Sequence, residues 1–109
     1  DSQLTLPHVP NWAEPVWHLY VLQTPDRAAI LERFEKAGIG SLVHYPIPPH
    51  MQKAYKDAAI AHDDLPLARD MAVQVLSLPI GPEISKDVAE RVVNVVLGYD
   101  VATKVFRLS

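Results

Sequence analysis

The feature that most constrains the fold is a proline-rich segment at residues 43–51. Three of the four residues at positions 46–49 are proline. Proline fixes φ, has no amide N–H, and pushes the residue before it into an extended conformation. The segment therefore predicts a stiff arm that leaves a strand, and it carries His44, Tyr45 and His50 on a backbone that loses little further entropy on binding a ligand.

The composition fits one globular domain. The 109 residues are 49% hydrophobic and 21% charged, and the ten prolines lie mostly in connections. A net charge of −3 without any run of basic residues argues against a nucleic-acid partner. The absence of cysteine excludes disulfides and fits a reducing, cytoplasmic compartment. Apolar runs stay well below the ~20 residues that a membrane span needs, so no membrane association is expected.

The first half of the chain predicts an extended lead-in, a strand and a helix. Prolines punctuate residues 1–15, and apolar residues then alternate through residues 16–23 with the period of a strand. Thr24-Pro25-Asp26 carries three helix-start signals, and Gly38-Ile39 is typical of a helix end. Residues 41–45 are expected to form a second strand that feeds the proline arm.

The second half predicts short helices, a third strand and a last helix. Residues 51–61 permit a helix with little pattern. Asp64 before Leu65-Pro66 predicts another helix start, and residues 74–78 return to a strand. Ser85 is the expected cap of the last helix. The side chains expected to face inward on these two helices are Ala68, Met71 and Ala72 on the first, and Val88, Val92, Val95, Val96 and Tyr99 on the last.

Together these elements predict an α+β fold. We expect a small two-layer sandwich in which helices pack on one face of a mixed or antiparallel three-stranded sheet. Such a layout leaves part of the other face bare, so an exposed apolar patch of several hundred Å² is expected.

Four motifs in order carry a resemblance to a known family. They are His18-Leu-Tyr-Val, a helix from Arg27 to Gly38-Ile39, His44-Tyr-Pro-x-Pro-x-His, and Leu76-Ser-Leu-Pro-x-Gly-Pro. From about Leu4 to about Tyr99 the chain resembles the carboxy-terminal small domain of the DegT/DnrJ/EryC1/StrS family, pyridoxal-phosphate enzymes of fold type I. The resemblance implies a lead-in at 1–15 from a large domain outside this chain, the small domain at 16–100, and a tail at 101–109.

The resemblance also implies an activity. Family members move an amino group to a nucleotide-linked keto-sugar, with glutamate as the expected donor, and are expected to be homodimers. Pyridoxal phosphate is expected to be bound mainly by the large domain, whose lysine forms the Schiff base. All five lysines here have the charged surroundings of surface residues, so no catalytic residue is assigned and the chain alone is expected to be inactive.

By the resemblance, the His-Tyr-Pro segment lies near the cleft between the two domains. His44, Tyr45 and His50 are therefore candidates for substrate binding, because imidazole and phenol hydrogen-bond to sugar hydroxyls and phosphate. A zinc site made by His44, His50 and His62 is disfavoured, because spacings of six and twelve match no compact site. No metal site is assigned. Ser77 lacks the turn that exposes a nucleophilic serine and is expected to be hydrogen-bonded in the core.

Two alternatives stay open at this point. A freestanding α+β binding module without catalysis is compatible with the same patterns, because a fold alone does not fix function. Relatives that dehydrate the sugar rather than aminate it are also compatible, because the residue that separates the two reactions lies outside this sequence. The identity of the sugar, its nucleotide and the pathway is not encoded in these residues.

Overall fold

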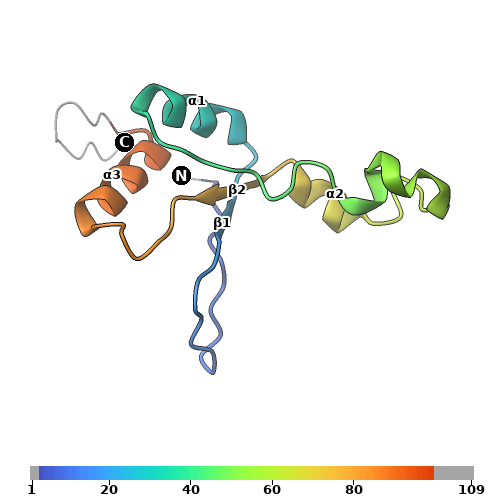
Figure 1. Ribbon diagram of the computed structural model, residues 1–109, viewed down its shortest axis with the longest axis horizontal. Helices are drawn as coiled ribbons and strands as arrows, with labels where there is room; N and C mark the ends of the chain where they lie inside the picture. The colour runs from blue at the N-terminus through green and yellow to red at the C-terminus, as the bar shows by residue number, and fades with distance from the viewer. Residues whose placement is uncertain (1–2, 100–109) are drawn as a thin grey trace.

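The computed structural model describes residues 3–99 and has an α+β architecture (Figure 1). In chain order the elements are β1 (Tyr20–Gln23), α1 (Arg27–Ala37), the 3-10 helices η1 (Pro49–Met51) and η2 (Lys53–Ala58), α2 (Pro66–Ala72), β2 (Val75–Leu78) and α3 (Lys86–Leu97). No helix among residues 3–99 is both long and apolar enough to cross a bilayer.

The sheet has two strands. β1 and β2 pair antiparallel, with Val21 opposite Ser77 and Leu22 opposite Leu76. The three-stranded sheet is not confirmed, because residues 41–45 contribute one isolated bridge, in which the Ser77 N–H donates to the Leu42 carbonyl at 2.8 Å. β1 also begins later than the predicted residue 16. At both places the chain diverges from the sheet into a proline-bounded segment, which cannot continue the ladder.

The two long helices begin and end close to the predicted residues. The Ser85 hydroxyl accepts a hydrogen bond from the Val88 N–H at 3.2 Å and caps α3. α1 starts one residue after Asp26, and its C-cap Gly38 has a φ of 67°, in the left-handed region that suits glycine. Glu32 and Lys36, one turn apart on α1, form an ion pair at 2.6 Å. These signals are local, which is why the sequence alone was sufficient for them.

One hydrophobic core joins the strands to these helices. Leu22 and Leu76, opposite each other in the sheet, are 1% and 0% exposed. They pack against the buried side chains of α1 and α3, which are Ile30, Phe34, Val92, Val95 and Val96. The helices therefore cover one face of the sheet, as expected.

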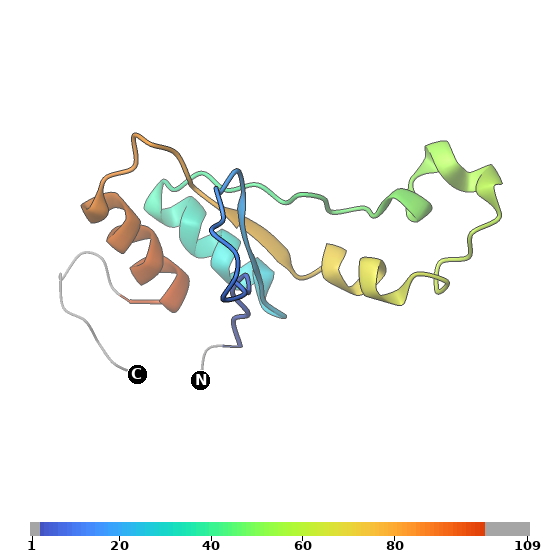
Figure 2. The same cartoon turned by 90° about the horizontal axis from the view of Figure 1, so that it is seen from below.

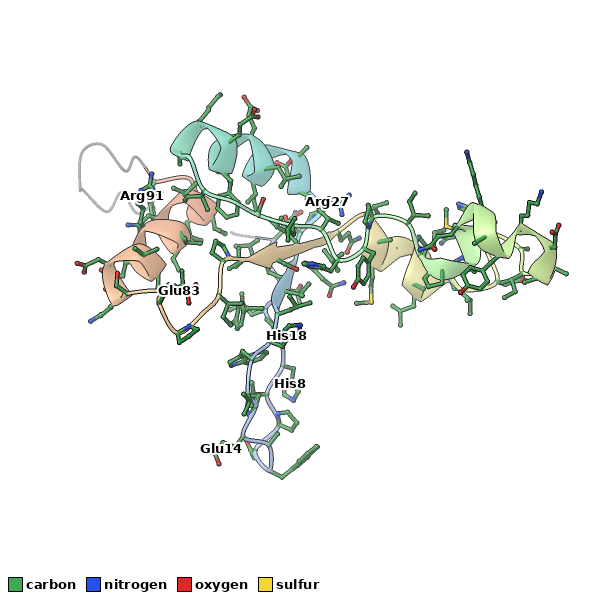
Figure 3. The ribbon with its side chains drawn as sticks, viewed as in Figure 1. His8, Glu14, His18, Arg27, Glu83 and Arg91 are labelled. Carbon is green, nitrogen blue, oxygen red and sulfur yellow. The ribbon has the colours of Figure 1, made fainter. Side chains whose placement is uncertain are left out.

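Two arginines connect the ends of α1 and α3. Arg33 on α1 donates from Nε to the Val95 carbonyl at 2.9 Å and from Nη2 to the Val96 carbonyl at 2.8 Å. Arg91 on α3 donates in return to the Ala37 carbonyl at the end of α1 (Figure 3 labels Arg91). Each helix thus places a charged donor on carbonyls at the C-terminus of the other, where a positive charge is favourable.

An arm formed by residues 45–73 extends away from this body (Figures 1 and 2). The radius of gyration is 16.4 Å, above the ~13 Å of a compact domain of about 100 residues. The prediction for α2 was mostly wrong: Ala72 is buried, but Ala68 and Met71 are exposed. The reason is that no second layer covers the arm, so an inward face does not exist there.

A loop at residues 6–19 forms the second extension, which projects from the sheet in Figure 1. Its side chains Trp12 and Val16 are 87% and 96% exposed. On the arm, Leu67 and Tyr45 are 74% and 70% exposed. Large apolar side chains are therefore exposed on the two extensions, while the apolar patch of several hundred Å² expected on the bare face of the sheet stays a prediction.

Candidate functional site

A cavity of about 410 Å³ lies beside β2 and the start of the arm. Side chains alternate between the faces of a strand, so Ser77 points away from the helices while Leu76 points toward them. The cavity is lined by His18, Leu19, Gly40, Ser41, Leu42, His44, Ser77, Leu78, Pro79 and Ile80. None of these residues carries a formal charge unless a histidine is protonated, so the cavity offers hydrogen bonds within apolar walls.

His44 is held in this cavity by Ser77. The His44 Nδ1 and Ser77 Oγ atoms are 2.8 Å apart, although the residues are 33 positions apart in the sequence. The Leu42–Ser77 bridge sets this approach, because it fixes the backbone two residues before His44. Ser77 is 4% exposed, which confirms the prediction that its hydroxyl is hydrogen-bonded in the core.

Tyr45 lies next to His44 and faces outward. The two rings meet edge to face, with centroids 5.4 Å apart and an interplanar angle of 89°. Such an arrangement is the favoured one for aromatic pairs. The predicted residues His44 and Tyr45 are thus brought together, with the phenol open to a ligand or a neighbouring domain.

His50 occupies a different environment. Its side chain is 8% exposed, and its Nε2 donates to the His62 carbonyl at 3.2 Å. The buried Nδ1 has no hydrogen-bond partner among the described residues. In this arrangement the His50 ring connects η1 to the turn at His62 and stabilises the arm.

Sequence reasoning did not assign His18 and Ser77 to the site. Figure 3 shows His18 where the loop meets β1, and it lines the same cavity as His44. The alternation of residues 16–23 placed His18 on one face of the predicted strand, but no local signal linked that face to residue 44. Ser77 stood out only as a polar residue within an apolar strand.

The shifted pKa values lie away from this cavity, at Glu32 on α1 and in a cluster on the arm. A hydrogen bond from His62 and the Arg69 guanidinium lower the pKa of Asp63, and Arg69 lowers the pKa of Asp70. The two carboxylates in turn raise the pKa of Arg69. His62 is therefore engaged with Asp63, at 3.1 Å, rather than with the other histidines.

The family model for the DegT/DnrJ/EryC1/StrS aminotransferase family matches residues 2–97. The chain belongs to this family. Among DegT/DnrJ/EryC1/StrS relatives, the erythromycin biosynthesis sensory transduction protein EryC1 of Saccharopolyspora erythraea is 40% identical over 83% of this chain and 25% of its own length. The dTDP-3-amino-3,4,6-trideoxy-alpha-D-glucose transaminase of Streptomyces venezuelae is 42% identical over 76% of this chain and 22% of its own.

The solved structure of S. venezuelae DesV in complex with a ketimine intermediate has the same fold, with a TM-score of 0.82 and 39% identity over 86% of this chain and 25% of DesV. The DegT/DnrJ/EryC1/StrS aminotransferase from Brucella abortus gives a TM-score of 0.80 at 27% identity, over 88% of this chain and 26% of its own length. The chain therefore spans about a quarter of the length of the relatives it matches.

The described residues do not form a site for pyridoxal phosphate by themselves. The side chains of Lys36 and Lys86 are 74% and 88% exposed, and Lys53 and Lys56 are exposed as well. Lys104 lies outside the described residues. The cavity at His44 is lined by no cation that would balance a phosphate. A DegT/DnrJ/EryC1/StrS member built on this chain therefore needs further residues to hold that cofactor.

Proposed function

We propose that this chain is the carboxy-terminal small domain of an aminotransferase that uses pyridoxal phosphate and transfers an amino group to a nucleotide-linked keto-sugar. The family match over residues 2–97 supports the proposal. The likeness to DesV, solved with a ketimine intermediate, adds support from the fold. The putative sugar aminotransferase Spr1654 of Streptococcus pneumoniae, 26% identical over 72% of this chain and 21% of its own length, was solved in a PMP-form, which agrees with this cofactor class.

The proposal also covers the amino donor, the oligomeric state, the compartment and the position of the Schiff-base lysine. Glutamate is the proposed amino donor, the enzyme is proposed to be a cytoplasmic homodimer, and the Schiff-base lysine is proposed to lie in a large domain outside this chain. The chain alone is then inactive. The exposed lysines described above and the zero cysteines are consistent with these statements.

The test is amino transfer by the full-length protein. We expect the purified enzyme to show the absorbance of a cofactor aldimine and to transfer nitrogen from glutamate to a keto-sugar attached to a nucleoside diphosphate. Residues 1–109 alone are expected to show neither property. A full-length protein without cofactor or transfer would contradict the proposal, and loss of the sugar hydroxyl without nitrogen incorporation would identify a dehydratase instead.

Within the enzyme, the substrate-binding residues His44, Tyr45 and His50 are proposed to act in two ways. His44 contacts the substrate from the cavity, Tyr45 contacts it from the exposed position beside His44, and His50 holds the arm through the His62 carbonyl. We expect His44→Ala to raise KM for the sugar nucleotide about tenfold, the effect of losing roughly 1.4 kcal/mol of hydrogen bonding. His62→Ala is the matched control, because it removes an exposed imidazole and keeps the carbonyl. Unchanged KM in His44→Ala would assign His44 to packing.

A further inference from the structure

The hydrogen bond between Ser77 and His44 has a direction that burial decides. The Ser77 side chain is 4% exposed, and its hydroxyl meets His44 Nδ1 and no other partner among the described residues. If Nδ1 carried the proton, it would donate to Ser77 Oγ and leave the hydroxyl proton without an acceptor among the described residues. A buried donor without an acceptor is unfavourable, because it has lost its hydrogen bond to water. If the hydroxyl donates to Nδ1 instead, both groups are satisfied.

The protonation of the second ring nitrogen of His44, Nε2, follows from that of Nδ1. A neutral imidazole has one N–H, so an unprotonated Nδ1 places the proton on Nε2. His44 Nε2 has no hydrogen-bond partner within residues 3–99, and His44 lines the 410 Å³ cavity. His44 therefore offers one N–H donor to whatever enters there.

The absence of charged side chains from the cavity lining limits which ligand groups the His44 N–H can bind. The lining residues include no lysine or arginine, and the charged clusters of the described chain lie elsewhere, on the arm and on helix surfaces. A diphosphate brought into such apolar walls would lose hydration without gaining a counter-charge. A hydroxyl or carbonyl oxygen of the sugar needs only a neutral donor.

We infer that Ser77 is a positioning residue that fixes the Nε2–H tautomer of His44, so that His44 donates to an uncharged sugar oxygen rather than to the phosphates. The inference rests on the proposed function for the identity of the ligand. The tautomer itself is a property of the protein and is measurable without substrate. No catalytic role is assigned to Ser77, because it acts through His44.

The first experiment measures the tautomer in the full-length protein labelled with ¹⁵N-histidine. Protonated and unprotonated ring nitrogens have well-separated ¹⁵N shifts, and a His44→Gln spectrum assigns the signals. At pH 8, above the ordinary titration range of histidine, we expect protonated Nε2 and unprotonated Nδ1 in the wild type and in Ser77→Thr, which keeps the hydroxyl. Ser77→Ala should populate both tautomers. A wild-type ring protonated on Nδ1 would overturn the inference, whatever the variants do.

The second experiment separates sugar from phosphate. Binding of the sugar nucleotide and of the nucleoside diphosphate without sugar is measured for the wild type, His44→Gln and His44→Glu. We expect His44→Glu, which offers an acceptor only, to weaken sugar-nucleotide binding about tenfold, and His44→Gln, which keeps an N–H, to lose less. Binding of the nucleoside diphosphate to His44→Gln should not change. If His44→Gln weakened the binding of both ligands equally, His44 would be donating to a phosphate, and the inference that it donates to a sugar oxygen would be overturned. If the wild type showed no amino transfer, the proposed function would be contradicted, but the measured tautomer of His44 would still hold.

Discussion

The Ser85 hydroxyl holds the first turn of α3 through the Val88 N–H. We expect Ser85→Ala to lower the free energy of unfolding by about 1 kcal/mol, because the amide loses its acceptor. Ser85→Asp, which keeps an acceptor and places a negative charge at the helix N-terminus, should retain the wild-type value. Urea unfolding followed by circular dichroism measures both. Equal losses in the two variants would show that the cap is not the cause.

Phe34 is 1% exposed at the centre of the core. We expect Phe34→Ala to cost about 3–5 kcal/mol, the usual range for deleting a buried aromatic ring. Leu67→Ala is the comparison, because Leu67 is 74% exposed on the arm. In the isolated chain its change should stay within about 0.5 kcal/mol. A large loss at Leu67 would mean that the arm is folded onto the body in solution.

At the scale of single residues, the sequence predicted which side chains would form hydrogen bonds but not which residues they would bind. Ser77 was expected to be hydrogen-bonded in the core, and it is. Its partner His44 was not predictable, because the pairing joins residues 33 positions apart through a bridge at Leu42. The substrate-binding role of His44, Tyr45 and His50 stays a prediction.

At the scale of elements, α1 and α3 depend on each other through Arg33 and Arg91. We expect Arg33→Ala to destabilise the chain by about 1.5–3 kcal/mol, because carbonyls at the end of α3 lose a charged donor. Lys36→Ala, one turn away on the same helix, should cost only about 0.3–0.5 kcal/mol, since its ion pair with Glu32 is exposed. Thermal unfolding of both variants is the measurement. Similar losses would contradict a specific role of Arg33.

The start of α2 carries the cluster Asp63, Arg69 and Asp70, with Arg69 Nε 2.8 Å from Asp70 Oδ1. Lowered carboxylate pKa values stabilise the fold at pH values above the ordinary range, and this contribution is lost as pH falls through the folded-state values. We expect Arg69→Gln to raise the pKa of Asp70 toward its ordinary value. The pKa of Asp63 should rise less, because the hydrogen bond from His62, which the substitution leaves in place, is the largest cause of its lowered pKa.

Carboxyl carbon shifts followed by NMR during an acid titration measure this directly. The pKa of Glu32, lowered by Lys36 on α1, serves as the internal control and should not move. An unchanged Asp70 in Arg69→Gln would show that the ion pair is absent in solution.

Among the elements, prediction succeeded where the signal was local. The caps at Ser85 and Gly38 are properties of short sequence windows. So is the apolar spacing of α3, which predicted the burial of Val92, Val95 and Val96 correctly, although Val88 is 44% exposed. The strand predicted at residues 41–45 is not confirmed, because strand pairing is non-local: these residues have a suitable composition, but only Leu42 bridges to β2 before the chain turns into the arm. The prediction of an inward face on α2 was mostly wrong, because it assumed that a second layer of structure covers this helix.

At the scale of the whole molecule, the loop at residues 6–19 and the arm at residues 45–73 expose apolar side chains and extend from a small hydrophobic core. We expect the isolated chain to self-associate at micromolar concentration, because the loop and the arm expose large side chains such as Trp12 and Leu67. Trp12→Asp should reduce the association without changing the midpoint of urea unfolding, since Trp12 is 87% exposed. Asn11→Asp adds the same charge beside it and is the matched control. Sedimentation velocity measures the change, and equal effects of both variants would attribute it to charge alone.

The arm leaves the body after Leu42 bridges β2 and returns just before β2 begins. None of the side chains in the main hydrophobic cluster comes from residues 45–73. Arg27 of α1 donates to the Ala72 carbonyl at 2.7 Å, so this end of the arm is attached to the body by a hydrogen bond rather than through that cluster. The segment between these attachment points can therefore be lengthened, shortened or re-surfaced while the scaffold that anchors it continues to fold.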